Sequence, residues 1–247
     1  QASCREALLE MAITFGTEGW RAIMAEEFTA DNVRLVTQAI ADHLTATVRH
    51  GRNGLTVAVG HDTRFLSDYF ARAVCEVLAG NQIQSVLSRG AIPTCAVSRY
   101  VVERSLPLGV MVTASHNPAI YNGLKVKEAY GGSATAETVA SIERRLGHSP
   151  VKSLPYEEAL KGGRLQHDDM LPRFLQGIRS FVDLGAIRRS SFRLIVDSMH
   201  GAGGRLIEGM LRGGRGRVTT LHADPDPFFG GQAPEPIASH LRDLSAR

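Results

Sequence analysis

The chain has 247 residues, enough for one large α/β domain or for two ordinary domains. Apolar residues make up 43% and charged residues 21%, a mixture that excludes disorder, collagen, a coiled coil and a disulfide scaffold. The net charge of +3 is too small to indicate a nucleic acid or a membrane as partner.

The three cysteines lie far apart, and none forms a Cys-x-x-Cys pair, which argues against structural zinc and favours a reducing, cytoplasmic setting. No apolar run approaches the ~20 residues of a membrane span. The first residues lack the basic and apolar regions of a signal peptide.

From residue 11 onward, short apolar runs alternate with amphipathic segments, the rhythm of a β–α protein. Thr29 can cap a first helix that carries Val33, Val36, Ile40 and Leu44 at helical spacing. The pattern predicts strands at 55–60, 83–88, 108–114 and 124–127, and helices around 71–80, from Pro93 towards Val102 and from Thr135 to Gly147. An Asn-Gly turn at 122–123 would permit one antiparallel strand. Residues 11–150 are therefore expected to form a three-layer α/β/α domain with a mostly parallel mixed sheet.

Residues 148–168 lose this period and are interpreted as the connection between domains. A second, incomplete α/β domain is expected over 165–247, with a helix near 172–182, strands in FRLIVD and VTTLHA, and a closing helix at 237–244. Only two strands are visible, fewer than a stable sheet usually needs.

The stretch MVTASHNPAIYNGLKVK (111–127) places Ser115, His116 and Asn117 just after a predicted strand. Loops at the carboxyl ends of strands build the sites of open α/β sheets. A serine there can carry a phosphoryl group or act as an acyl nucleophile, but Ser, Asn and Pro also make plain turns. A serine hydrolase is disfavoured, because adjacent Ser and His rarely reach triad geometry and no G-x-S-x-G elbow is present.

Several blocks in a fixed order accompany this loop. They are FGTEGWRA (15–22), GHDTRFLS (60–67), IPT (92–94), T-A-S-H-N-P followed by Y-N-G-L-K, VDSMHGAGG (196–204) and FFGGQAPEPI (228–237). Together they resemble the α-D-phosphohexomutases, the superfamily of phosphoglucomutase, phosphomannomutase and the phosphoglucosamine mutases.

The resemblance implies a phosphoryl relay. Ser115 would carry a phosphoryl group to a sugar 1- or 6-phosphate of glucose or mannose, and the bisphosphate would return the other group. Lys125 would be the general acid–base and phosphate partner, and Arg21 would grip phosphate oxygens. His116 and Asn117 would fix the loop by hydrogen bonds.

The same resemblance implies Mg²⁺ bound through the Ser115 phosphate, an activator of the glucose 1,6-bisphosphate type, and a phosphosugar partner. Arg64 and Thr17 are expected substrate contacts, although an ion pair of Arg64 with Asp62 or Asp68 is an open alternative. The superfamily's D-G-D-x-D-R metal loop does not occur in the 247 residues. We therefore expect an N-terminal half that is inactive alone and a possible homo-oligomer; the alternative is a non-catalytic remnant that serves binding or assembly.

Overall fold

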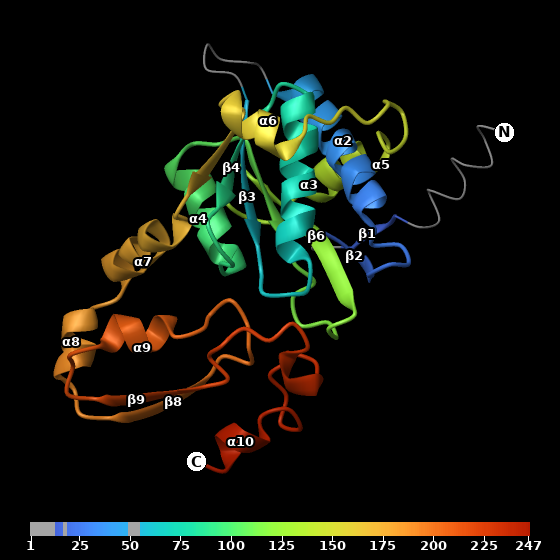
Figure 1. Ribbon diagram of the computed structural model, residues 1–247. Coiled ribbons are helices and arrows are strands. Elements are labelled where there is room, and N and C mark those ends of the chain that lie inside the picture. The colour runs from blue at the N-terminus through green and yellow to red at the C-terminus, as the bar shows by residue number, and fades with distance from the viewer. Residues whose placement is uncertain (1–12, 17–18, 49–54) are drawn as a thin grey trace.

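The computed structural model describes residues 13–16, 19–48 and 55–247 (Figure 1). A first part, up to residue 182, holds a large sheet with helices packed on it. A smaller second part, from residue 183 onward, is built on two strands and lies beside the first. The α/β fold class is confirmed. No helix in these ranges is long and apolar enough to cross a bilayer.

The large sheet is mixed. Its strands are β1 (Phe15–Gly16), β2 (Gly19–Ile23), β3 (Thr56–His61), β4 (Gln84–Ser88), β5 (Leu108–Val112), β6 (Tyr121–Glu128) and β7 (Leu165–Asp168). They lie in the order β1-β2-β6-β5-β3-β4-β7. The pairs β3–β4, β3–β5 and β4–β7 are parallel, whereas β1–β2, β2–β6 and β5–β6 are antiparallel.

Helices cover both faces of this sheet and make a three-layer sandwich (Figure 1). One face is covered by α2 (Ala30–Thr47), α3 (Ser67–Gly80), α5 (Ala136–Glu143) and α6 (Tyr156–Lys161), the other by α4 (Thr94–Glu103) and α7 (Met170–Phe181). Successive strand residues serve opposite faces: Val57 and Val59 pack towards α3, and Ala58 packs towards α4. The strands at the centre are thus buried on both sides.

The first long helix, α2, forms where its sequence pattern predicts it. Thr29 accepts a hydrogen bond from the backbone N–H of Asn32 at 3.3 Å and caps the helix. Val33, Val36 and Ile40 are fully buried against the core. A cap followed by an apolar stripe was enough to locate this element.

The expected Asn-Gly turn at 122–123 is wrong, because both residues lie inside β6. Asn122 is buried and donates its side-chain N–H to Ser67 Oγ at 3.0 Å, while its Oδ1 accepts the N–H of Gly123 at 2.8 Å. These contacts keep the chain extended where the dipeptide alone favours reversal. The antiparallel strand itself is confirmed.

The region expected as a plain connection, 148–168, also holds α6 and β7. β7 is an edge strand that pairs with β4 in the large sheet, although it falls inside the range expected for the second domain. Only Leu165 of its four residues is buried, so the alternating pattern that marks a strand is missing.

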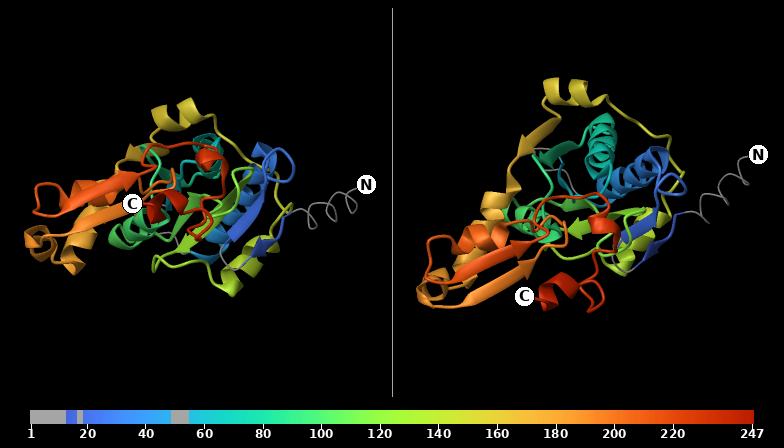
Figure 2. Two further views of the ribbon diagram at one scale, coloured as in Figure 1. Left: turned by 90° about the horizontal axis from the view of Figure 1, so that it is seen from below. Right: turned by 60° about the horizontal axis from the view of Figure 1, so that its bottom comes forward.

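The second part contains two strands, as expected, and they pair in parallel. Its elements are α8 (Leu184–Arg189), β8 (Arg193–Asp197), α9 (Leu206–Leu211), β9 (Arg217–Leu221), a 3₁₀ turn η1 (Phe229–Gly231) and α10 (Arg242–Ser245). Both views of Figure 2 show β8 and β9 extending away from the large sheet. The closing helix is shorter than the expected 237–244, because His240 Nδ1 bonds the backbone carbonyl of Glu235 and makes a turn there.

Candidate active site

Ser115 lies in the serine loop, residues 113–120, which follows β5. Its side chain is exposed, and its backbone has a φ of 58°, the left-handed region that non-glycine residues rarely adopt. The N–H of Ser115 donates to Thr113 Oγ1 at 3.0 Å, and the N–H of Asn117 donates to the carbonyl of Ala114 at 3.2 Å. Such a conformation costs about 1–3 kcal/mol and persists only where the surroundings impose it.

Arg64 supplies much of that constraint. Its Nη1 donates to the carbonyls of Pro118 and Tyr121 at 2.9 and 3.0 Å. Its Nη2 donates to the carbonyls of Ser115 and Asn117 at 2.8 and 2.7 Å. The residue is only 3% exposed, so these bonds form away from water, where hydrogen bonds to a charged group are strong.

Asp62 balances the buried charge of Arg64. Its Oδ2 lies 3.3 Å from Arg64 Nε, and its Oδ1 accepts from the Arg64 backbone N–H and from Ser67 Oγ. Desolvation lowers the pKa of Arg64, an effect that Asp62 opposes and that repulsion from Arg21 reinforces. Of the two ion pairs left open by the sequence, the structure contains the one with Asp62.

Lys125 and Arg21 lie on the same face of the sheet. Leu124 and Val126 pack towards α2 and α3, so Lys125 between them faces the other side, opposite Met111 on β5. Arg21 on β2 pairs with Gly123, two residues before Lys125, and therefore shares that face.

Arg21 also reaches the serine loop directly. Its Nη1 donates to Asn117 Oδ1 at 2.9 Å. Lys125 is only 8% exposed. The structure thus brings two cationic side chains from neighbouring strands to one face of the sheet. Met111 lies on the same face and, with Ser115, lines a cavity.

Gly123 makes this arrangement possible. A Cβ at this position would lie 2.6 Å from the Trp20 carbonyl and 2.7 Å from the Thr113 carbonyl, and 3.1 Å from Arg21 Cγ. The glycine is needed because the backbones of β2 and the serine loop approach it closely. Trp20 itself is a core residue, 1% exposed and packed on Phe28.

Two expected site residues are less defined. His116 is exposed beside Ser115. Thr17 lies outside the described residues. Sequence reasoning missed the hydrogen bond from Asn122 to Ser67, which links the GHDTRFLS and Y-N-G blocks, and the bond from Ser67 to Asp62. The available signal was that Ser67 and Asn122 are polar residues at the edges of buried segments.

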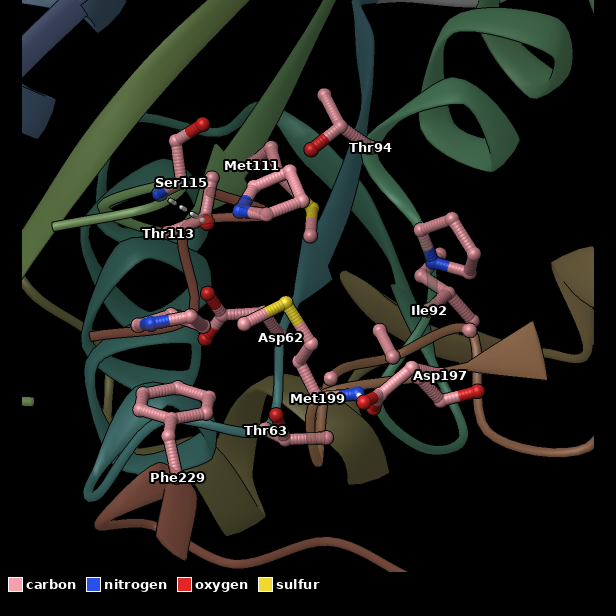
Figure 3. A pocket seen from close by; sticks show the side chains of 17 residues that line it. Asp62, Thr63, Ile92, Thr94, Met111, Thr113, Ser115, Asp197, Met199 and Phe229 are labelled. Carbon is pink, nitrogen blue, oxygen red and sulfur yellow. Dashed lines mark hydrogen bonds between the residues drawn. The ribbon is translucent and has the colours of Figure 1, made fainter. Parts of the chain in front are cut away.

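A cavity of about 370 Å³ opens beside Ser115, between the two parts of the molecule (Figure 3). Figure 3 shows Met111 and Met199 near its centre, Thr94 and Ser115 on one side and Phe229 on another. Its polar lining includes the side chains of Asp62, Thr63, Thr94, Thr113, Ser115, Asp197 and Ser198. The glycine turn of residues 201–203 completes the wall, so this turn meets the serine loop across one cavity.

Two contacts join the parts at this cavity. Thr63 Oγ1 donates to the carbonyl of His200 at 3.0 Å. The Arg64 guanidinium carbon lies 5.0 Å from the centroid of the Phe229 ring, within the range of a cation–π contact. Both contacts come from the loop that follows β3.

The turn after β8 is held by Asp197, a residue that sequence reasoning did not select. Its Oδ1 accepts the Met199 N–H at 2.9 Å and lies 2.8 Å from His222 Nδ1. Nε2 of the same ring lies 3.4 Å from Asp243 Oδ2 on α10. The turn does not lead straight into a helix, because α9 begins only at Leu206.

In the described ranges, no three His, Cys, Asp or Glu side chains gather as a metal site. Magnesium usually requires carboxylate oxygens in addition to phosphate. These residues alone therefore do not fit a complete Mg²⁺ site.

Comparison with known proteins agrees with this geometry. A family profile for phosphoglucomutase/phosphomannomutase, alpha/beta/alpha domain I, matches residues 12–150, and the profile for domain II matches residues 172–247. The chain belongs to the phosphoglucomutase/phosphomannomutase family.

Relatives within this family carry different sugar names. A Methanobrevibacter smithii protein, provisionally assigned as a phosphoglucosamine mutase, is 30% identical over 230 residues, which are 93% of this chain and 48% of the relative. A phosphoglucomutase/phosphomannomutase of Thermococcus kodakarensis is 30% identical over 232 residues, 94% of this chain and 49% of that protein.

A crystal structure from Thermus thermophilus, provisionally assigned as a phosphomannomutase, superposes with a TM-score of 0.84 at 37% identity. The match covers 95% of this chain and 51% of that one. The chain thus spans about half the length of the relatives that it matches.

Proposed function

We propose that this chain carries the phosphoserine half of a phosphohexomutase, with Ser115 as the residue that accepts and returns the phosphoryl group. The observation that carries the proposal is the exposed Ser115 hydroxyl beside the cavity, in a loop whose carbonyls accept hydrogen bonds from Arg64. Lys125 and Arg21 on the adjacent strands add positive charge suited to phosphate oxygens.

The proposed step is a phosphoryl transfer from a hexose 1,6-bisphosphate. The bond between phosphorus and a sugar oxygen breaks, a bond between phosphorus and Ser115 Oγ forms, and the hydroxyl proton ends on the sugar oxygen. In this proposal Lys125 moves that proton and Arg21 neutralises the charge on the phosphoryl oxygens. Asn117, held by Arg21, and His116 orient the loop.

The substrate class is a phosphosugar, of glucose or mannose. Family membership supports the class, and the differing names of the relatives leave the sugar open between hexoses. A bisphosphate of the glucose 1,6-bisphosphate type would charge the serine. The described residues lack a cluster of carboxylate ligands for Mg²⁺, so the proposed step assigns chemical roles to Ser115, Lys125 and Arg21 alone.

A cytoplasmic location is part of the proposal, supported by Cys75 and Cys95, which are both free thiols. Burial raises the pKa of Cys75 to about 12, so this thiol stays protonated and unreactive.

Isotopic labelling tests the role of Ser115. A full-length phosphohexomutase that contains this chain as its N-terminal half is incubated with glucose 1,6-bisphosphate labelled with ³²P, in buffer containing Mg²⁺, and the label is mapped by peptide mass spectrometry. We expect label on Ser115 and none in the Ser115→Ala variant. Ser105→Ala is a matched control, because Ser105 is also exposed and also has a left-handed backbone, with a φ of 51°. Absence of label from Ser115 would overturn the proposal.

A second test separates the two lysines of β6. Lys125→Met should slow labelling of Ser115 by about 10²–10⁴-fold, the usual contribution of a positioned acid–base group. Lys127→Met is the control, since Lys127 lies two residues further along the same face and bonds Ser133 Oγ at 3.2 Å. Equal rates in the two variants would remove Lys125 from the proposed step.

The competing function is a non-catalytic remnant that keeps the fold for binding or assembly. Such a protein would remain unlabelled at Ser115 under all these conditions while folding normally.

A further inference from the structure

The guanidinium of Arg64 has five N–H donors. Four of them are used by the carbonyls of Ser115, Asn117, Pro118 and Tyr121. The fifth, on Nε, is buried 3.3 Å from Asp62 Oδ2 and makes no hydrogen bond. No accessible donor is therefore left for a phosphate, which makes Arg64 unsuited to the substrate contact expected from the sequence.

We propose instead that Arg64 is a positioning residue that holds Ser115 in its left-handed conformation, and that Phe229 of the second part keeps Arg64 in place. This inference rests on the proposed role of Ser115. In this proposal the second part helps to hold the serine loop in shape without touching the reacting atoms.

Phe229 is suited to this role because it is itself fixed. The ring is 5% exposed, and the residue has a φ of 53° at the start of η1. Asp226 holds the turn: its carboxylate accepts the N–H groups of Phe228 and Gly230, and its carbonyl accepts that of Phe229. These backbone N–H groups lower the pKa of Asp226 and keep it ionised as an acceptor.

The ring then closes the exposed side of a buried cation. A desolvated guanidinium against an aromatic face is stabilised by the ring quadrupole. Removal of the ring would let water reach the guanidinium and compete for its four carbonyl partners. A single line of contacts thus runs from Phe229 through Arg64 to the carbonyl of Ser115.

Hydrogen exchange of the serine loop gives a readout independent of chemistry. The amides of Asn117 and Tyr121 bond the carbonyls of Ala114 and Pro118, so their exchange reports whether the loop keeps its shape. In Arg64→Lys, an ammonium has only three donors and no planar fork. We expect exchange of these amides to rise roughly tenfold or more. Arg72→Lys is the control, since Arg72 is a largely exposed arginine on α3.

The contribution of Phe229 is tested with its neighbour as control. Phe229→Ala should speed exchange of the serine loop, whereas Phe228→Ala should not, because Phe228 is 70% exposed. Phe229→Tyr keeps an aromatic face and should restore protection. Phe229→Leu keeps the apolar volume and should restore less. Equal protection in the leucine and tyrosine variants, or no change in the alanine variant, would overturn the role of the ring.

The rate of Ser115 labelling distinguishes positioning from phosphate binding. If Arg64 positions the loop, Arg64→Lys lowers the maximal rate of labelling and leaves the half-saturating bisphosphate concentration within about twofold. A rise in that concentration with an unchanged maximal rate would show a direct phosphate contact and overturn the proposal. Failure of the unaltered full-length protein to take label would refute the phosphoserine proposal, while the exchange measurements would still decide whether Arg64 and Phe229 shape the loop.

Discussion

The two parts of the molecule differ in how completely their strands are buried. All five residues of β5 in the first part are buried, whereas every residue of β8 and β9 in the second part is exposed or half-buried. Of the proposed reacting groups, Lys125 lies on the buried sheet and Ser115 lies in the loop that follows β5, whereas the glycine turn and Phe229 come from the less buried part. Ser115 thus follows a fully buried strand, whereas the groups that face it across the cavity come from a part whose strands bury less.

The largest expected effect comes from moving the boundary of the first part. A chain ending at residue 182 keeps β7 and α7, whereas one ending at 150 loses the buried side chains of Leu165 and Met170, which are 2% and 0% exposed. Burial of two such side chains contributes about 3–6 kcal/mol. We expect the longer chain to unfold cooperatively in urea, monitored by the fluorescence of Trp20, and the shorter one to be largely unfolded.

Equal stability of these two chains would show that the first part ends near residue 150, as the sequence pattern alone suggested. A control ending at residue 191 includes α8, which has no buried residue, and should match the chain ending at 182.

A smaller effect is expected from single truncations in the two parts. Leu78→Ala on α3 removes a fully buried side chain and should lower the free energy of unfolding by about 2–5 kcal/mol. Ile195→Ala on β8 removes a half-buried one and should cost about 1 kcal/mol or less, since less apolar area is lost. Urea titrations would measure each loss of free energy, and hydrogen exchange would locate it in the structure. Equal losses in the two variants would refute the contrast in burial between the two parts.

Elements with a local signal were predictable from the sequence. The cap at Thr29 and the stripe that follows it located α2, and the apolar run at 108–114 located β5. The order of the motifs predicted the family, which the comparisons show. The chemistry proposed for Ser115 depended on the same motifs.

Features that depend on distant partners were not predictable. Arg64 bonds carbonyls 51 to 57 residues away, and Asp197 meets His222 at a separation of 25 residues. No local pattern encodes such pairs. An arginine that bonds distant carbonyls and an arginine in a surface loop look alike in the sequence. β7 escaped prediction for a related reason: its place is determined by β4, where Ser85 pairs with Leu165, and not by its own alternation.

The smallest expected effect is a pH dependence confined to the first part. His43 on α2 lies 2.9 Å from Ser141 Oγ, and that same oxygen accepts a hydrogen bond from Arg145 at 2.7 Å. The Ser141 hydroxyl is therefore free to donate to a neutral imidazole. Desolvation, reinforced by the charge of Arg145, lowers the pKa of His43 below its ordinary value near 6.5.

Because the folded state binds this proton less readily than the unfolded chain does, the stabilisation is complete above about pH 6.5 and declines as the pH falls towards the lowered pKa. The loss cannot exceed about 1.4 kcal/mol per pH unit for one group.

We expect urea midpoints measured through Trp20 to fall between pH 7.5 and 5.5. His43→Gln should flatten that slope, because glutamine accepts the same hydrogen bond without titrating. His148→Gln, at an exposed position, is the control. Part of the slope should survive in His43→Gln, since burial also lowers the pKa of His167 on β7. A slope that is unchanged in His43→Gln would mean that the contact between α2 and α5 does not depend on the neutral imidazole.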